Sequence, residues 1–215
     1  CMVMVTDDAQ RTMCTFLGIT ASFSEEELDE VALKNSKWLY VEGYLVASPT
    51  GQVAARTALN MAKKHNVKTS LTMSDVNMVK FFRNNIDALL ETKIDLLFCN
   101  EAEAMEFAGT SDLSHAREVL KKVAKQFVIT LGSNGSIIWD GTMFIDIEPH
   151  TVKAIDSNGA GDMFAGAFLY GITHGHTLAG AGTIASLASS KVVTKFGPRF
   201  EKKDAEFVLK ELFGE

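Results

Sequence analysis

One stretch of the chain, residues 151–171, combines three local patterns that few folds accommodate together. A β-branched run (Thr151–Ile155) meets a polar glycine turn (Asp156–Asp162), and an apolar helical pattern (Met163–Tyr170) follows. The glycines of the turn lack a Cβ, so the backbone can bend sharply there and bring successive N–H groups close to a ligand. The sequence therefore predicts a strand, an anion-binding turn and a helix, in this order.

The chemistry of this turn suits a phosphate. The first N–H groups of a helix have no partner inside it, and the helix dipole adds partial positive charge there. Asp162 follows these amides and is well placed to take a proton from an attacking alcohol, a role worth roughly 100- to 10,000-fold in rate. The amides of Gly159, Ala160 and Gly161 would stabilise the charge of a phosphoryl group in transfer. The alternative is a glycine turn that only caps a helix.

The segment Asp156–Asp162 reads D-S-N-G-A-G-D and resembles the D-T-x-G-A-G-D signature of the ribokinase-like (PfkB) carbohydrate and nucleoside kinases. Ser157 replaces the usual threonine and keeps its hydroxyl. The resemblance implies that Asp162 is the catalytic base, that the three small residues before it form the anion hole, and that Asn158 helps to bind the nucleotide. It also implies ATP and Mg²⁺ as cofactors. Some family members use K⁺ near the preceding strand, which would place Asp156 beside that ion.

A second polar pair follows the predicted strand Ile94–Phe98, where Asn100 and Glu103 stand. Ligands of open α/β sheets gather at the carboxyl ends of strands, so both side chains are placed for chemistry. They are similar to the N-x-x-E motif of the same family, which implies that they help to hold Mg²⁺ and its waters. The alternative is an asparagine N-cap with glutamates in the first helical turn.

A third motif, T-L-G-x-x-G, follows the predicted strand Phe127–Leu131. It resembles the family loop that approaches the nucleotide, which implies ATP contacts for Thr130, Gly132 and Gly135. A plain turn between strands is the alternative, and the two interpretations are compatible.

The N-terminal residues predict a β-hairpin, with strands Met2–Thr6 and Thr12–Phe16 around a turn at Asp7–Arg11. In the resembled family such strands form a lid over the acceptor, which makes Arg11 a candidate substrate contact. A solvated arginine is the alternative. A homodimer formed through the lid is compatible with this interpretation.

Strand and helix patterns alternate along the rest of the chain, which is typical of a doubly wound parallel sheet. We expect a three-layer α/β/α fold of the ribokinase-like type, with lid strands at 1–16 and a kinase core at 17–215. In the family a further N-terminal segment holds the acceptor, and we expect that segment to be missing before Cys1. Val53, Ala54, Leu59 and Met61 are expected to face inward. The predicted helices are 24–33, 48–65, 75–90, 112–125, 163–174, 177–194 and 201–213, and the other predicted strands are 38–41, 67–73, 136–139 and 143–147.

Composition limits the partners. The chain has 215 residues and a net charge of −6 with scattered basic residues, which argues against nucleic-acid binding and for a small ligand. Three cysteines without paired spacing predict reduced thiols, the five histidines have no metal-ligand spacing, and no apolar run suits a membrane span. The composition fits a cytoplasmic protein, and the family resemblance implies a kinase that phosphorylates a hydroxymethyl group of a sugar or nucleoside of the adenosine, ribose or fructose class. A non-catalytic nucleotide-binding regulatory subunit is the alternative, and the G-x-G-x-x-G pattern of a dehydrogenase is absent.

Overall fold

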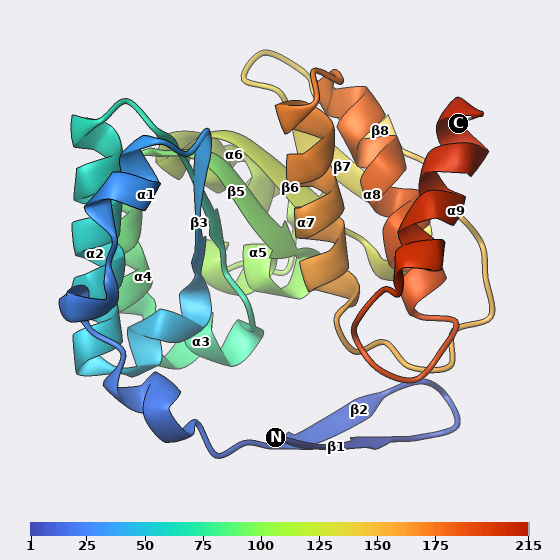
Figure 1. Cartoon of the computed structure of the whole chain (residues 1–215), viewed down its shortest axis with the longest axis horizontal. Coiled ribbons are helices and arrows are strands. Elements are labelled where there is room, and N and C mark those ends of the chain that lie inside the picture. The colour runs from blue at the N-terminus through green and yellow to red at the C-terminus, as the bar shows by residue number, and fades with distance from the viewer. Residues whose placement is uncertain (215) are drawn as a thin grey trace. The chain divides into compact units, whose positions relative to one another are not determined.

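The computed structural model describes residues 1–214 (Figure 1). The chain forms two compact units. Unit 1 contains residues 1–16, 131–138 and those from 145 onward, and unit 2 contains residues 17–130 and 139–144.

Unit 2 is built on four parallel strands that pair in chain order. Leu97 stands in register between Leu71 and Phe127, and all three side chains are fully buried. The sequence predicted this parallel sheet from the alternation of strand and helix patterns, and the centre of the sheet is buried on both faces. The strands are β3 (Trp38–Glu42), β4 (Lys68–Thr72), β5 (Ile94–Asn100) and β6 (Ala124–Thr130). Two further strands, β7 (Ser136–Trp139) and β8 (Phe144–Ile147), each contain residues of both units.

The longest helix of unit 2, α2 (Pro49–Lys64), begins where the sequence predicted. The Ser48 hydroxyl accepts a hydrogen bond from the Gly51 N–H, and proline occupies the first helical position, where its missing N–H costs nothing. Ala54 and Leu59 are buried as expected. The prediction for Val53 was wrong, since it lies about 100° around the helix from Ala54 and is exposed, and Met61 is only half-buried.

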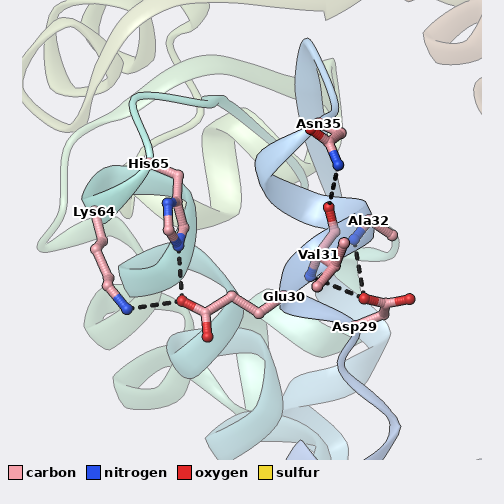
Figure 2. A network of polar contacts seen from close by, with 7 residues as sticks. All are labelled: Asp29, Glu30, Val31, Ala32, Asn35, Lys64 and His65. Carbon is pink, nitrogen blue, oxygen red and sulfur yellow. Dashed lines mark hydrogen bonds and ion pairs between the residues drawn. The ribbon is translucent and has the colours of Figure 1, made fainter.

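The predicted helix 24–33 is two short elements. The Ser24–Glu27 capping box is present, but it opens only a 3-10 turn (Glu25–Glu27), after which Leu28 is extended. The Asp29 carboxylate then accepts hydrogen bonds from the first N–H groups of a new helix, α1 (Glu30–Lys34), as Figure 2 shows. A second cap thus restarts the helix.

Glu30 fastens α1 to the end of α2 (Figure 2). Its Oε1 lies 2.8 Å from Lys64 Nζ and 2.7 Å from His65 Nε2. These hydrogen bonds, that of Lys64 first, lower the pKa of Glu30 to about 2. The two helices are therefore joined by a carboxylate that stays ionised over most of the acidic range.

The remaining helices of unit 2 follow the predicted alternation with one further break. The predicted helix 75–90 divides at Phe82, whose φ and ψ of −122° and 30° lie outside the helical region. The helices are α3 (Val76–Phe81), α4 (Arg83–Leu90), α5 (Glu101–Ala108) and α6 (Leu113–Val123), with 3-10 turns at Gly18–Ser22 and Gly43–Ala47.

Unit 1 begins with the predicted hairpin, in which β1 (Met2–Val5) and β2 (Arg11–Cys14) pair antiparallel. Arg11 is the first residue of β2 rather than part of the turn. Three helices follow later in the chain, α7 (Ala160–Thr173), α8 (Leu178–Val192) and α9 (Lys202–Phe213). Gly171 allows α7 and α8 to approach closely, because a Cβ there would lie 2.8 Å from the Cα of Ala181.

The prediction of a strand at Thr151–Ile155 was wrong. The segment is irregular and exposed, although its β-branched composition is typical of a strand. The N–H groups of Ile155 and Asp156 both donate to the carbonyl of Val193, just after α8, at 2.7 and 3.2 Å. The helix end therefore supplies the partner that a neighbouring strand would supply.

The sequence also predicted reduced thiols and no membrane span. Cys1, Cys14 and Cys99 are free, the first two exposed and the third buried. Within residues 1–214, no helix has the length and apolar character needed to cross a bilayer.

Candidate functional site

The glycine turn of unit 1 is held in shape by Asp156, whose side chain is buried. One carboxylate oxygen accepts a hydrogen bond from the Asn158 N–H at 2.8 Å, and the other accepts from the Gly197 N–H at 3.0 Å. Two backbone donors thus compensate the burial of this charge. Asp156 fixes the start of the turn and ties it to the loop at Gly197. The predicted K⁺ contact of Asp156 stays a prediction.

Gly159 is required by both its conformation and its surroundings. Its φ of 75° lies in the left-handed region, and a Cβ at this position would lie 2.4 Å from the Cβ of Pro198. No L-residue with a side chain meets both conditions without movement of the loop. The turn conformation is therefore specified by a glycine at this position.

The N-terminus of α7 is open to a ligand. Its N-cap, Gly159, provides no side-chain acceptor, whereas a first-turn N–H of α2, α6 and α8 donates to the side-chain oxygen of Ser48, Asp112 and Thr177, respectively. A Cβ built on Gly161 would meet no atom within 4 Å. The Ala160 N–H donates to the Ser157 carbonyl at 3.4 Å, a long hydrogen bond. A helix N-terminus without a side-chain cap and with open space at Gly161 fits an anion such as a phosphoryl group.

Asp162 lies in the first turn of α7, where its side chain is exposed. It borders a groove of about 530 Å³ whose other walls are mainly apolar. A carboxylate beside uncapped amides and reachable from solvent can accept a proton from a bound alcohol. The groove is lined by Met163, Gly166, Ala167, Tyr170, Ile184, Ala188, Pro198, Arg199, Phe200, Ala205, Val208 and Leu209.

The structure brings Arg11 to the glycine turn. Its Nη1 donates a hydrogen bond to the Ser157 hydroxyl at 3.0 Å, and this hydroxyl donates to the carbonyl of Ala9 at 2.8 Å. A cation from the hairpin is thus held next to the predicted anion site, where the sequence placed a substrate contact. Its role in binding stays a prediction.

In unit 2, Asn100 ends β5 and caps α5. Its Oδ1 accepts from the Glu103 N–H at 2.8 Å, while the Glu103 carboxylate accepts from the Asn100 N–H at 3.0 Å and from Asn100 Nδ2 at 2.7 Å. Burial raises the pKa of Glu103 to about 7, the Asn100 N–H opposes this shift, and the charge of Asp75 adds to it. The capping alternative therefore describes the geometry found.

Amide and carboxylate oxygens are also the ligand types that Mg²⁺ prefers, with waters completing its shell. Asn100 and Glu103 fit such a metal by type, since each oxygen retains a lone pair. Among residues 1–214, no group of three or more histidine, cysteine, aspartate or glutamate side chains could enclose a metal. A bound ion would thus depend on waters and phosphate oxygens, and the metal role stays a prediction.

The third motif spans the end of β6 and the following turn. Thr130 stands directly opposite Asn100 in the parallel register of β5 and β6, so the carboxyl ends of these strands bring the two predicted contacts side by side. In unit 1 the Leu131 N–H donates to the Gly135 carbonyl at 2.8 Å and closes the turn. Gly132 and Gly135 both have positive φ, and a Cβ on Gly135 would lie 2.1 Å from the Ile147 carbonyl oxygen. Contacts to ATP stay a prediction.

Sequence reasoning missed part of the frame of the glycine turn. Gly197 and Pro198 were visible only as a break in a helical pattern, although they contact Asp156 and Gly159. Ala9 gave no signal, because an alanine rarely adopts a positive φ, which here is 62°. These contacts join residues far apart in the sequence and become visible only in the fold.

A parallel α/β sheet, a glycine turn that opens a helix and an aspartate in its first turn are features of the ribokinase-like fold. The chain belongs to this family, since residues 1–205 match the pfkB family of carbohydrate kinases.

Two solved structures and one relative compared by sequence are similar to this chain and are named as kinases. The fold is similar to that of a probable sugar kinase from Rhizobium etli CFN 42, with a TM-score of 0.93 and 31% identity over 98% of this chain and 64% of that chain. The fold is also similar to that of an adenosine kinase from Sinorhizobium meliloti, with a TM-score of 0.92 and 31% identity. This match covers 98% of this chain and 65% of the adenosine kinase. A ribokinase from Lactococcus lactis is 35% identical over 124 residues, 55% of this chain and 40% of that protein. The chain spans less than two thirds of the length of each.

Proposed function

We propose that this protein is an ATP-dependent kinase that transfers a phosphoryl group to a hydroxymethyl group of a sugar or nucleoside. The observation that carries the proposal is the uncapped N-terminus of α7 at the Gly159 turn, with the exposed carboxylate of Asp162 in the same helical turn. Phosphoryl transfer requires mainly positioning and charge stabilisation, and both are available at this place.

Each residue of the turn has a distinct task in this proposal. The amides of Gly159, Ala160 and Gly161 stabilise the charge on the phosphoryl oxygens, and the carboxylate of Asp162 takes the proton of the acceptor hydroxyl. Asp156 keeps the turn preorganised through its two backbone hydrogen bonds.

Nucleotide and metal contacts are proposed for the remaining motifs. Thr130, Gly132, Gly135 and Asn158 contact ATP, and Asn100 and Glu103 hold Mg²⁺ through its waters. When bound, the ion neutralises phosphate charge. An Escherichia coli protein described as a ribokinase II, with a TM-score of 0.79 and 21% identity, has been solved with ATP and Mg²⁺, which supports this choice of cofactors.

The acceptor class follows from the relatives, which include proteins named as sugar, ribose and adenosine kinases. We propose adenosine, ribose and fructose as the acceptors to test. The free thiols support a reducing, cytoplasmic location. The exposed side chains of Met2, Met4 and Met13 on the hairpin support a homodimer through the lid.

The test is ADP release by the protein with Mg²⁺ and ATP against each acceptor. We expect release that depends on one acceptor class and that falls at least 100-fold in Asp162→Asn. Tight ATP binding without release for any acceptor would instead support a regulatory nucleotide-binding subunit.

A further inference from the structure

Ser157, the residue that departs from the family signature, lies at the centre of three hydrogen bonds. Its N–H donates to the Ala9 carbonyl at 3.3 Å, and its hydroxyl donates to the same carbonyl at 2.8 Å. The hydroxyl also accepts from Arg11 Nη1 at 3.0 Å. A serine in the glycine turn therefore contacts two residues of the hairpin.

These contacts hold the hairpin in place. Both strands are largely exposed, with every residue of β2 exposed to solvent. Within residues 1–214, the three bonds of Ser157 are the hydrogen bonds that join residues 1–16 to the rest of unit 1. The one buried apolar residue of this segment is Ala9, which accepts two of them in a left-handed conformation that a non-glycine residue adopts only when its surroundings hold it there.

The hydroxyl chemistry fixes the direction of the Arg11 contact. A serine hydroxyl has one proton, and here the hydroxyl uses it to donate a hydrogen bond to the Ala9 carbonyl. The hydroxyl oxygen therefore presents a lone pair to the guanidinium, which donates one of its five N–H groups. Arg11 forms no ion pair with any carboxylate in the described part of the chain. Its charge and remaining donors stay available to an anion at the turn.

We propose that Ser157 is a positioning residue, which holds the Arg11 guanidinium beside the glycine turn so that this cation stabilises the phosphoryl group in transfer. Arg11 contacts the substrate, and Ser157 acts through Arg11. The inference rests on the proposed kinase function and adds a residue to it. Hydrogen bonds from a guanidinium to phosphoryl oxygens are charge-assisted, and their geometry depends on how the side chain is fixed.

The kinetic test compares Ser157→Ala, Ser157→Thr, Arg11→Gln and the double variant Ser157→Ala/Arg11→Gln. We expect Ser157→Ala to lower kcat about tenfold, the effect of losing one hydrogen bond of ordinary strength, with little change in the KM for ATP. Ser157→Thr keeps the hydroxyl and should restore kcat to within about twofold of the starting protein. The double variant should be no slower than Arg11→Gln alone, since Ser157 acts only through that side chain.

A second readout needs no activity, because trypsin cleaves after Arg11. Ser157→Ala should be cut there several times faster than the starting protein and Ser157→Thr at the starting rate, with thermal unfolding followed as a control for general destabilisation. Additive losses of kcat, no rescue by threonine, or unchanged cleavage after Arg11 would each overturn the inference. Asp162→Asn and the starting protein are assayed in parallel. No acceptor-dependent turnover in the starting protein would contradict the kinase proposal, and retained turnover in Asp162→Asn would contradict the base role of Asp162. Additive Ser157 and Arg11 effects in a protein that does turn over would contradict only the role of Ser157.

Discussion

The two glycines of the glycine turn, Gly159 and Gly161, should separate stability from activity. Gly159→Ala places a methyl group at a φ of 75° and 2.4 Å from the Cβ of Pro198. The left-handed conformation costs about 1–2 kcal/mol for a residue with a side chain, and moving Pro198 adds about 1–3 kcal/mol, as overpacking does elsewhere. We therefore expect the free energy of unfolding to fall by about 2–5 kcal/mol, which lowers Tm by about 4–20 °C in a chain of this size.

Gly161→Ala is the matched control, only two residues away. A Cβ there meets nothing within 4 Å, and alanine is favoured over glycine in a helix by about 1 kcal/mol, so the stability should be unchanged or slightly higher. Its methyl group would occupy open space beside the proposed anion site, and we expect turnover to fall at least tenfold. Urea unfolding and ADP release on both variants measure the two effects. A Gly159→Ala protein within about 0.5 kcal/mol of the starting stability, a difference typical of neutral surface changes, would refute the steric reasoning.

Three further predictions concern unit 2. Because the pKa of Glu103 is raised to about 7 in the folded protein, the free energy of unfolding should fall by up to about 3 kcal/mol as pH rises from about 4.5 to 7. Glu103→Gln should remove this pH dependence in urea unfolding without metal. An unchanged pH dependence in the variant would contradict the burial of the Glu103 carboxylate. The pKa of Glu30 is lowered to about 2, so its contribution to stability should be present above about pH 4.5 and be lost as pH falls through 2. Glu30→Gln should therefore weaken protection of the α1 amides from hydrogen exchange at pH 6 but not at pH 2. Equal protection in the variant and the starting protein at pH 6 would contradict this role of Glu30. Leu97→Ala, in the fully buried centre of the sheet, should cost about 2–5 kcal/mol in urea unfolding, and a cost below about 1 kcal/mol would show that the strand is not packed as described.

Much of the fold was predictable because local pattern and tertiary structure agree. The apolar stretches in β5 and β6 and the caps at Ser48, Asp112 and Thr177 are local signals, and each marks a strand or a helix start in the structure. The glycine turn was predictable for the same reason, since Gly159 within the turn specifies its conformation.

The failures have a different origin. The capping box at Ser24 begins only a 3-10 turn, and Asp29 caps the α-helix that follows. The sequence pattern alone does not show which of the two caps begins the α-helix. Thr151–Ile155 has strand composition, yet its neighbours in space decide its backbone hydrogen bonds. The contact of Arg11 with Ser157 joins residues 146 positions apart, so only the fold brings them together.

The central claim is that Asp162 acts as the base in phosphoryl transfer rather than as a nucleotide contact. Single-turnover transfer from ATP to the acceptor, measured beside ATP affinity in the same preparations of the starting protein and Asp162→Asn, tests it most directly. The account predicts ATP affinity within about threefold of the starting protein and a transfer rate at least 100-fold lower in the variant. A transfer rate that is unchanged, or that falls only as far as ATP affinity falls, would contradict it.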